Sequence, residues 1–156
     1  MRPAIRFLCS LLLMIPALPC LAQEDVKGEI EYTRAQIQAD RQAITTAAMQ
    51  LSEKEGEAFW PVYRDYRQAM NGLGDRTLKL IQSYASKYES LTDPDAIGLV
   101  NEYLAIKKDE FDLKKKWVKE FEKVLPARKV ARFCQVENKL DAIISYELAA
   151  GIPMVK

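Results

Sequence analysis

Residues 93–125 read DPDAIGLVNEYLAIKKDEFDLKKKWVKEFEKVL, and this stretch decides the fold. Its apolar residues recur at intervals of three, four or seven positions, which is typical of an amphipathic helix. They form two stripes, which lie about 110° apart when each residue turns the helix by 100°. The first stripe is Ile97, Val100, Leu104, Phe111, Val118, Phe121 and Leu125, and the second is Leu99, Tyr103, Ile106, Leu113, Trp117 and Val124. Together they predict a long helix with an apolar face nearly half its circumference wide.

This apolar face is wider than the seam that two paired helices need. The extra width can cover a second neighbouring helix, form a dimer contact or stay open as a binding surface. The sequence leaves these three alternatives open.

A second long helix precedes this one. Its apolar and aromatic residues step by four and three from Phe59 through Tyr63 and Tyr66 to Tyr84, an unbroken seam. Ser52 and Glu55 have the spacing of a capping box at its start. The connection between the two helices is short, so we expect them to form an antiparallel hairpin.

Two further helices complete the predicted fold. The first covers residues 26–48, with Ile30, Ile37, Ile44 and Leu51 on one face and Arg41 facing away from it. The last covers residues 127–149, with a seam of Val130, Phe133, Leu140, Ile144 and Leu148. The sequence therefore predicts an all-α fold of four helices with a long central antiparallel hairpin, an elongated bundle formed by a single domain over residues 23–156.

Residues 1–22 have the features of a signal peptide. Arg2 and Arg6 precede an apolar run at residues 7–18 that is too short to span a bilayer comfortably. Small-residue preference at the cleavage site favours a cut after Ala22 and export to the periplasm. Cleavage removes two arginines and no acidic residue, so the formal charge of +1 becomes −1. A retained membrane anchor and a lipoprotein attached through Cys20 are the less favoured alternatives.

The composition argues against several classes of function. The chain has no histidine, which removes the commonest general base and the commonest transition-metal ligand. It is 29% charged but nearly neutral, which argues against binding nucleic acid through bulk charge. Carboxylates are plentiful, yet they do not form a calcium-binding loop. We therefore expect no cofactor, no metal site and no enzymatic activity.

Cys134 is the cysteine that stays after cleavage, because Cys9 and Cys20 leave with the signal peptide. An unpaired cysteine in an oxidising compartment can form an intermolecular disulfide. The alternative is a small buried side chain that is never oxidised, and its position beside Phe133 on a helical face favours this alternative.

Two helix starts share a pattern in which a leucine is followed eight positions later by a phenylalanine. The residues are Leu51 with Phe59, and Leu125 with Phe133. The first start, Leu51-Ser52-Glu53-Lys54-Glu55, resembles the Leu-Thr-x-x-Gln motif of the Spy/CpxP family of periplasmic stress proteins, whereas the second keeps only the leucine. The resemblance implies a cradle-like helical homodimer that binds unfolded or aggregating proteins without ATP.

The candidate surface for such clients combines aromatic, apolar and basic side chains. Its residues are Lys107, Phe111, Lys114, Trp117, Val118, Phe121, Arg128 and Arg132. Aromatic side chains suit exposed apolar groups of a non-native chain, and cations favour fast capture. The alternative is an ordinary bundle whose lysines lie at its rim. Two further hypotheses are an accessory protein that docks on one envelope partner, such as a signalling kinase, and a structural dimer without clients.

Overall fold

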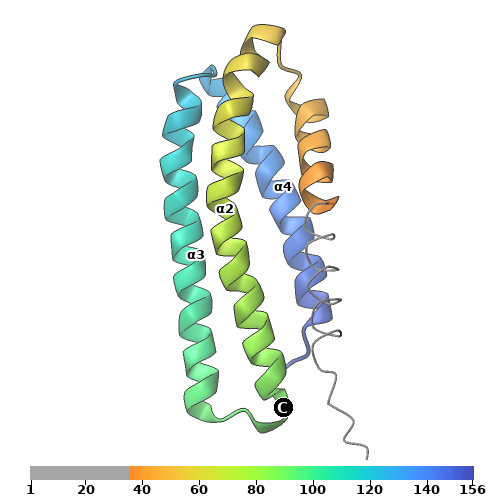
Figure 1. Ribbon diagram of the computed structural model, residues 1–156, viewed down its shortest axis with the longest axis vertical. Helices are drawn as coiled ribbons and strands as arrows, with labels where there is room; N and C mark the ends of the chain where they lie inside the picture. The colour runs from red at the N-terminus through yellow and green to blue at the C-terminus, as the bar shows by residue number, and fades with distance from the viewer. Residues whose placement is uncertain (1–35) are drawn as a thin grey trace, which may run out of the picture. The chain divides into compact units, whose positions relative to one another are not determined.

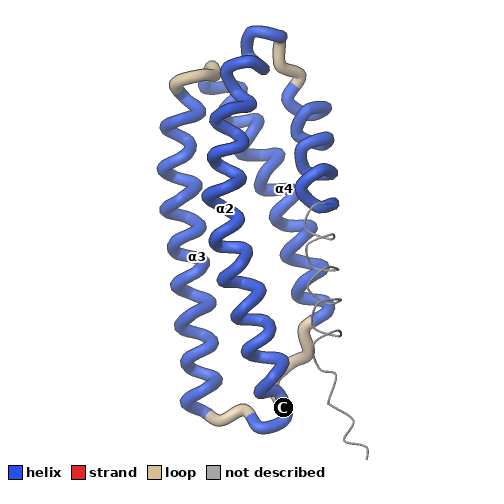
Figure 2. The backbone as a smooth tube through the Cα atoms, in the orientation of Figure 1, coloured by secondary structure: helices blue, strands red, loops and turns tan. Residues whose placement is uncertain are grey.

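The computed structural model describes residues 36–156. Within this range it contains a helix at residues 36–49, α2 (Glu53–Lys87), the short 3-10 helix η1 (Tyr88–Ser90), α3 (Asp93–Glu122) and α4 (Ala127–Gly151), and no strand (Figures 1 and 2). The chain divides into two units between Asp40 and Arg41, and the contacts described below belong to the second unit. The predicted signal peptide at 1–22 lies outside the described residues.

The prediction of an all-α fold with a central helical hairpin is confirmed. Helices α2 and α3 lie side by side and run in opposite directions, joined through η1 (Figure 1). The side chain of Thr92 accepts a hydrogen bond from the Asp95 backbone N–H and so caps α3, with Pro94 in the first turn. None of the helices in the described part of the chain is long and apolar enough to cross a membrane.

The predicted capping box at the start of α2 is confirmed. Ser52 Oγ accepts a hydrogen bond from the Glu55 backbone N–H at 3.3 Å, and the Ser52 N–H donates to Glu55 Oε2 at 2.8 Å. Lys129 Nζ of α4 lies 3.3 Å from the same Glu55 oxygen, so the box also ties α4 to α2.

Ser52→Ala should lower the free energy of unfolding by about 1 kcal/mol, because the first turn of α2 loses the acceptor for an otherwise unpaired N–H. Urea unfolding followed by tryptophan fluorescence measures the change. Ser145→Ala, at an exposed position within α4, is the matched control and should change stability by less than about 0.5 kcal/mol. Equal effects of the two substitutions would contradict the capping role.

The core of the second unit is an aromatic cluster where α2 begins, α3 ends and α4 begins. Its buried members are Met49, Phe59, Tyr63, Tyr66, Phe121, Leu125, Val130 and Phe133. The predicted pair of helix starts meets inside this cluster, because the ring centroids of Phe59 and Phe133 are 5.4 Å apart in an edge-to-face arrangement. Leu51 packs against the cluster from outside and Leu125 is one of its members. The repeated Leu–Phe pattern therefore builds one shared core.

The predicted orientation of the first helix is wrong over residues 41–49, the part that belongs to the second unit. We call residues 41–49 the arm; its buried face consists of Arg41, Thr45 and Met49, and Arg41 is only 4% exposed. Ile44, which was expected to face inward, is 46% exposed. The physical reason is that Arg41 finds carboxylate partners on α4, whereas the isoleucine spacing carried no information about such partners.

Candidate functional site

The first apolar stripe of α3 is buried at one end and exposed at the other. Near the turn into α4, Phe121 and Leu125 belong to the core and Val118 packs against it. Toward the start of α3 the stripe continues as Ile97, Val100, Leu104 and Phe111, which are all exposed. We call these four residues the open stripe.

The open stripe begins where α3 and α4 separate. Lys114, in line with the stripe, forms an ion pair with Asp141 of α4 at 2.7 Å, so this side of α3 still faces α4 at that level. From the turn at Leu125 onward the two helices diverge, with α2 between them in the view of Figure 1. The open stripe is thus the continuation of a core-forming face beyond the point where α4 covers it.

The structure divides the eight residues predicted for the client surface into buried and exposed groups. Phe121 is 1% exposed and therefore does not lie on a surface in this structure: its ring packs against Phe59 and Phe133. Trp117 and Val118 are partly buried and pack against the same core. In the half of α3 near α4, the apolar face is wide because it packs against α4 as well as α2.

The other five residues predicted for the client surface do not form one patch with Trp117, Val118 and Phe121. Lys114 is engaged between carboxylates of α3 and α4. Phe111 is 66% exposed, and Lys107 beside it is exposed as well. Arg128 and Arg132 are exposed on the first two turns of α4. Of the predicted set, Phe111 and Lys107 are the ones that lie along the open stripe.

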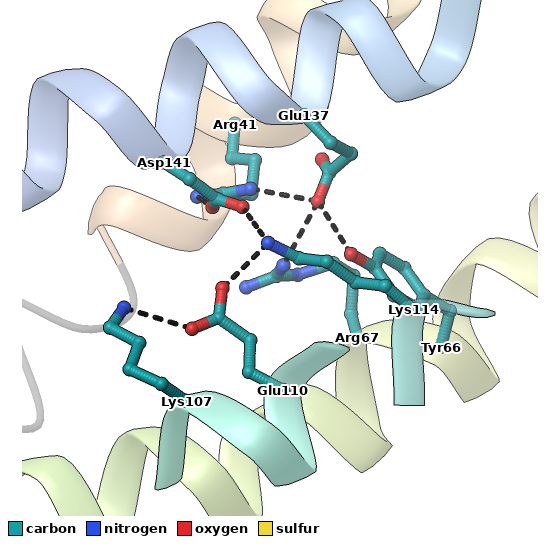
Figure 3. Close-up of polar contacts among 8 residues, drawn as sticks. All are labelled: Arg41, Tyr66, Arg67, Lys107, Glu110, Lys114, Glu137 and Asp141. Carbon is teal, nitrogen blue, oxygen red and sulfur yellow. Dashed lines mark hydrogen bonds and ion pairs between the residues drawn. The ribbon is translucent and has the colours of Figure 1, made fainter. Parts of the chain in front are cut away.

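A polar cluster with buried members joins α4 to the arm, α2 and α3 (Figure 3). At its centre is Glu137, whose Oε2 accepts hydrogen bonds from Arg41 at 2.8 Å, from the Tyr66 hydroxyl at 3.0 Å and from Arg67 at 3.3 Å. These donors come from the arm and from α2. One carboxylate of α4 therefore joins two other parts of the unit in a region where an unpaired charge would be costly.

The cluster extends from α4 to the open stripe through a second set of ion pairs. Asp141 accepts from Arg41 at 2.7 Å and from Lys114 at 2.7 Å. Lys114 also donates to Glu110, which accepts a further bond from Lys107 (Figure 3). The arm, α4 and the lysines that flank Phe111 are thus connected by one continuous chain of charges.

Two carboxylates of the cluster have lowered pKa values. Burial on its own raises the pKa of Asp141, but hydrogen bonds from Lys114 and Arg41 outweigh it and leave the pKa below its usual value. In the same way, the bonds from Lys114 and Lys107 outweigh burial at Glu110 and lower its pKa. Burial and the charge of Glu137 raise the pKa of Tyr66, which keeps its hydroxyl protonated as a donor.

These shifts predict a loss of stability in acid. A carboxylate with a lowered pKa in the folded state stabilises the fold above its unfolded pKa, and this contribution disappears as the pH falls through the folded value. We expect the free energy of unfolding to decline from about pH 5 downward. Asp141→Asn should cost about 1–3 kcal/mol at pH 7, because hydrogen bonds to a charged acceptor are lost. The difference in the free energy of unfolding between Asp141→Asn and the unmodified chain should shrink toward about pH 2–3.

Urea unfolding at a series of pH values measures this dependence. Asp65→Asn on α2 is the control, because Asp65 is exposed. If the free energies of unfolding of Asp141→Asn and the unmodified chain differed by the same amount from pH 7 to pH 2, the lowered pKa of Asp141 would be contradicted.

The polar cluster could have been found in the sequence from one signal. Residue 137 stands four positions after Phe133 and three before Leu140, inside the predicted apolar seam of α4, and it is a glutamate. A carboxylate at a seam position requires a buried cation or donor. The sequence does not identify the cation that pairs with this glutamate. The isoleucine spacing predicts that Arg41 faces away from the bundle, which excludes the correct partner.

Cys134 is half-buried and packs against the core, and burial raises the pKa of its thiol. A raised pKa lowers the fraction of reactive thiolate. The described residues also contain no group of His, Cys, Asp and Glu side chains suited to hold a metal ion. What the site offers is an exposed apolar stripe beside a network of paired charges, an arrangement suited to binding.

Comparisons of the chain with family models, with curated proteins and with solved structures found no match.

Proposed function

We propose that this protein binds non-native polypeptides on the open stripe without ATP, as a chaperone-like protein of the periplasm. The observation that carries the proposal is the exposure of Ile97, Val100, Leu104 and Phe111 in one row. Single exposed apolar residues are ordinary on a protein surface, but four large ones along one face of a helix are typical of an interaction site.

The charges beside the open stripe support a client rather than a single tightly fitted ligand. Lys107 and Lys108 lie on α3 between Leu104 and Phe111, and each is paired with a carboxylate of the same helix. Such exposed pairs are weak and exchange readily with acidic groups of a bound chain. An apolar row with exchangeable ion pairs suits many sequences, whereas a specific ligand site needs a concave pocket with fixed polar groups.

Aggregation of an unrelated unfolded protein tests the proposal. The purified chain at equimolar concentration should slow light scattering by a diluted, denatured client without ATP. Leu104→Ser/Phe111→Ser should weaken this suppression several-fold, because both side chains are exposed and the fold does not depend on them. Met154→Ser/Val155→Ser, which removes two exposed apolar side chains from the C-terminal tail, is the control and should leave suppression unchanged. No suppression at several-fold excess would refute the proposal.

We also propose a homodimer, since a second copy can cover apolar surface of α3 or α4. Exposed apolar side chains near the end of α4, including Ile143, Tyr146 and Leu148, add to the surface available for such a contact. Light scattering of the purified chain measures the mass. One specific binder in a crosslinking pull-down, together with no suppression of aggregation, would favour an accessory protein that docks on one envelope partner. A non-reducing gel tests at the same time whether Cys134 forms an intermolecular disulfide.

A further inference from the structure

We infer that the arm, residues 41–49, is a latch: it opens while α2, α3 and α4 stay folded, and its opening uncovers part of the aromatic cluster as a second surface for apolar segments of non-native chains. The inference rests on the proposed function for its client and on the contacts of the arm for its mechanism.

The arm is held by few apolar contacts. Of its three buried side chains only Met49 is apolar, and Arg41 and Thr45 are polar. Its isoleucine, Ile44, faces outward. Helices in proteins are stabilised mainly by burial of an apolar face, so the arm lacks the contact that keeps α2, α3 and α4 together. Segments with few buried apolar contacts are the ones that open locally.

Two features of the closed arm oppose closure. Thr45 Oγ1 and Tyr63 OH are both buried and close together, but they do not reach full hydrogen-bond geometry with each other or with another described group. Poorly satisfied buried hydroxyls destabilise the conformation that buries them. Gln50, which follows the arm, has φ of 47°, in the left-handed region that non-glycine residues disfavour. This residue is the natural hinge, because a change of its backbone conformation relieves the strain.

Closure depends on the guanidinium of Arg41. It donates to Glu137 at 2.8 Å and to Asp141 at 2.7 Å, and both bonds join the arm to α4. At the other end of the arm, Lys129 Nζ of α4 donates to the carbonyl oxygens of Met49 at 3.4 Å and of Gln50 at 2.7 Å, next to the hinge. Without the Arg41 bonds, the end of the arm opposite Gln50 would have no ion pair with α4.

Glu137 and Asp141 each keep a cationic partner when the arm leaves. Glu137 keeps the Tyr66 hydroxyl at 3.0 Å and Arg67 at 3.3 Å, and Asp141 keeps Lys114 at 2.7 Å. The departing Arg41 gains water. Opening therefore leaves neither carboxylate without a cation, which is the outcome that normally prevents the separation of buried ion pairs.

Opening withdraws Met49 from the aromatic cluster. Met49 is fully buried there together with Phe59, Tyr63 and Phe133. Its removal leaves an apolar site lined by aromatic rings, which an apolar side chain of a non-native chain can fill in its place. The balance between open and closed arms would then set how much of this second surface is available.

Three variants test the latch. Arg41→Ala removes the anchor and should favour opening. Thr45→Val/Tyr63→Phe removes both poorly satisfied hydroxyls at nearly constant shape and should favour closure. Arg64→Ala is the matched control, because Arg64 is an exposed arginine of α2 outside the polar cluster.

Hydrogen exchange measured by mass spectrometry reads the opening directly. Protection of the backbone amides at 45–49 should fall at least tenfold in Arg41→Ala, rise several-fold in Thr45→Val/Tyr63→Phe and stay constant in Arg64→Ala. Amides in the middle of α3 should keep their protection in all three variants. Equal losses of protection in the arm and in α3 would overturn the latch, because the arm would then open only with the whole unit.

Two further readouts connect opening with binding. Fluorescence of the apolar dye ANS should increase in Arg41→Ala, and the concentration needed for half-suppression of client aggregation should fall several-fold. Both should change in the opposite direction in Thr45→Val/Tyr63→Phe. Faster hydrogen exchange in the arm with unchanged dye binding would refute the claim that opening uncovers an apolar surface. If no variant suppresses aggregation, the proposed function fails, and exchange with dye binding alone then decides whether the latch exists.

Discussion

Glu137→Leu is expected to lower the free energy of unfolding by about 3–5 kcal/mol, the range for removing one partner of a buried ion pair. The carboxylate is buried and accepts from Arg41, Tyr66 and Arg67. Leucine would leave the Tyr66 hydroxyl and the Arg67 guanidinium without this acceptor, while Arg41 would keep only Asp141. The expected loss is a large fraction of the 5–15 kcal/mol that stabilises a typical domain. Urea unfolding followed by tryptophan fluorescence measures it.

Two comparisons separate the charge network from general effects of the substitution. Glu147→Leu introduces the same residue at an exposed position of α4 and should change stability by less than about 0.5 kcal/mol. Arg67→Met combined with Glu137→Leu should recover part of the loss, because replacing both members of a buried pair by apolar groups avoids the unpaired cation. Strictly additive losses in the double variant would contradict a direct interaction between Arg67 and Glu137.

The helices could be predicted from the periodicity of the sequence, and the hairpin from the short connection between two of them. The seam from Phe59 to Tyr84 and the two stripes of α3 specify long helices, and the short connection specifies their antiparallel order. The capping box could also be predicted, since its two residues are three positions apart and form a local contact.

The orientation of the arm could not be predicted in this way, because it depends on a contact between distant residues. Isoleucines at intervals of seven favour one face, but the bonds of Arg41 to Glu137 and Asp141 turn the other face inward. A periodic pattern shows which residues share a face of a helix and does not show which charges on another helix that face will meet. The glutamate within the seam of α4 was the one local sign of this contact.

The same limit applies to the apolar face of α3, which is uniform in sequence and divided in the structure. Phe111 and Phe121 belong to one stripe, and the pattern treats them alike. The divergence of α4 from α3 decides that Phe121 is buried and that Phe111 is exposed (Figure 1). The Lys114–Asp141 pair still joins the two helices at the level between these two phenylalanines, and no repeat of apolar residues encodes such a contact.

Phe121→Ala and Phe111→Ala test this division with one chemical change on one helix. Phe121→Ala should lower the free energy of unfolding by about 3–5 kcal/mol, because the ring is 1% exposed and its loss leaves a cavity. Its centroid lies 4.4 Å from that of Phe133, 5.5 Å from Phe59 and 5.7 Å from Tyr66, so these three rings would each lose a neighbour.

Phe111→Ala removes a ring that is 66% exposed and should change stability by less than about 1 kcal/mol. Suppression of client aggregation should instead be weakened by Phe111→Ala, although its stability stays nearly unchanged. A large loss of stability from Phe111→Ala would mean that the open stripe is covered in solution, either by another part of the chain or by a second copy. Protein concentration distinguishes the two, because stability supplied by a second copy rises with concentration, whereas stability supplied within one chain does not.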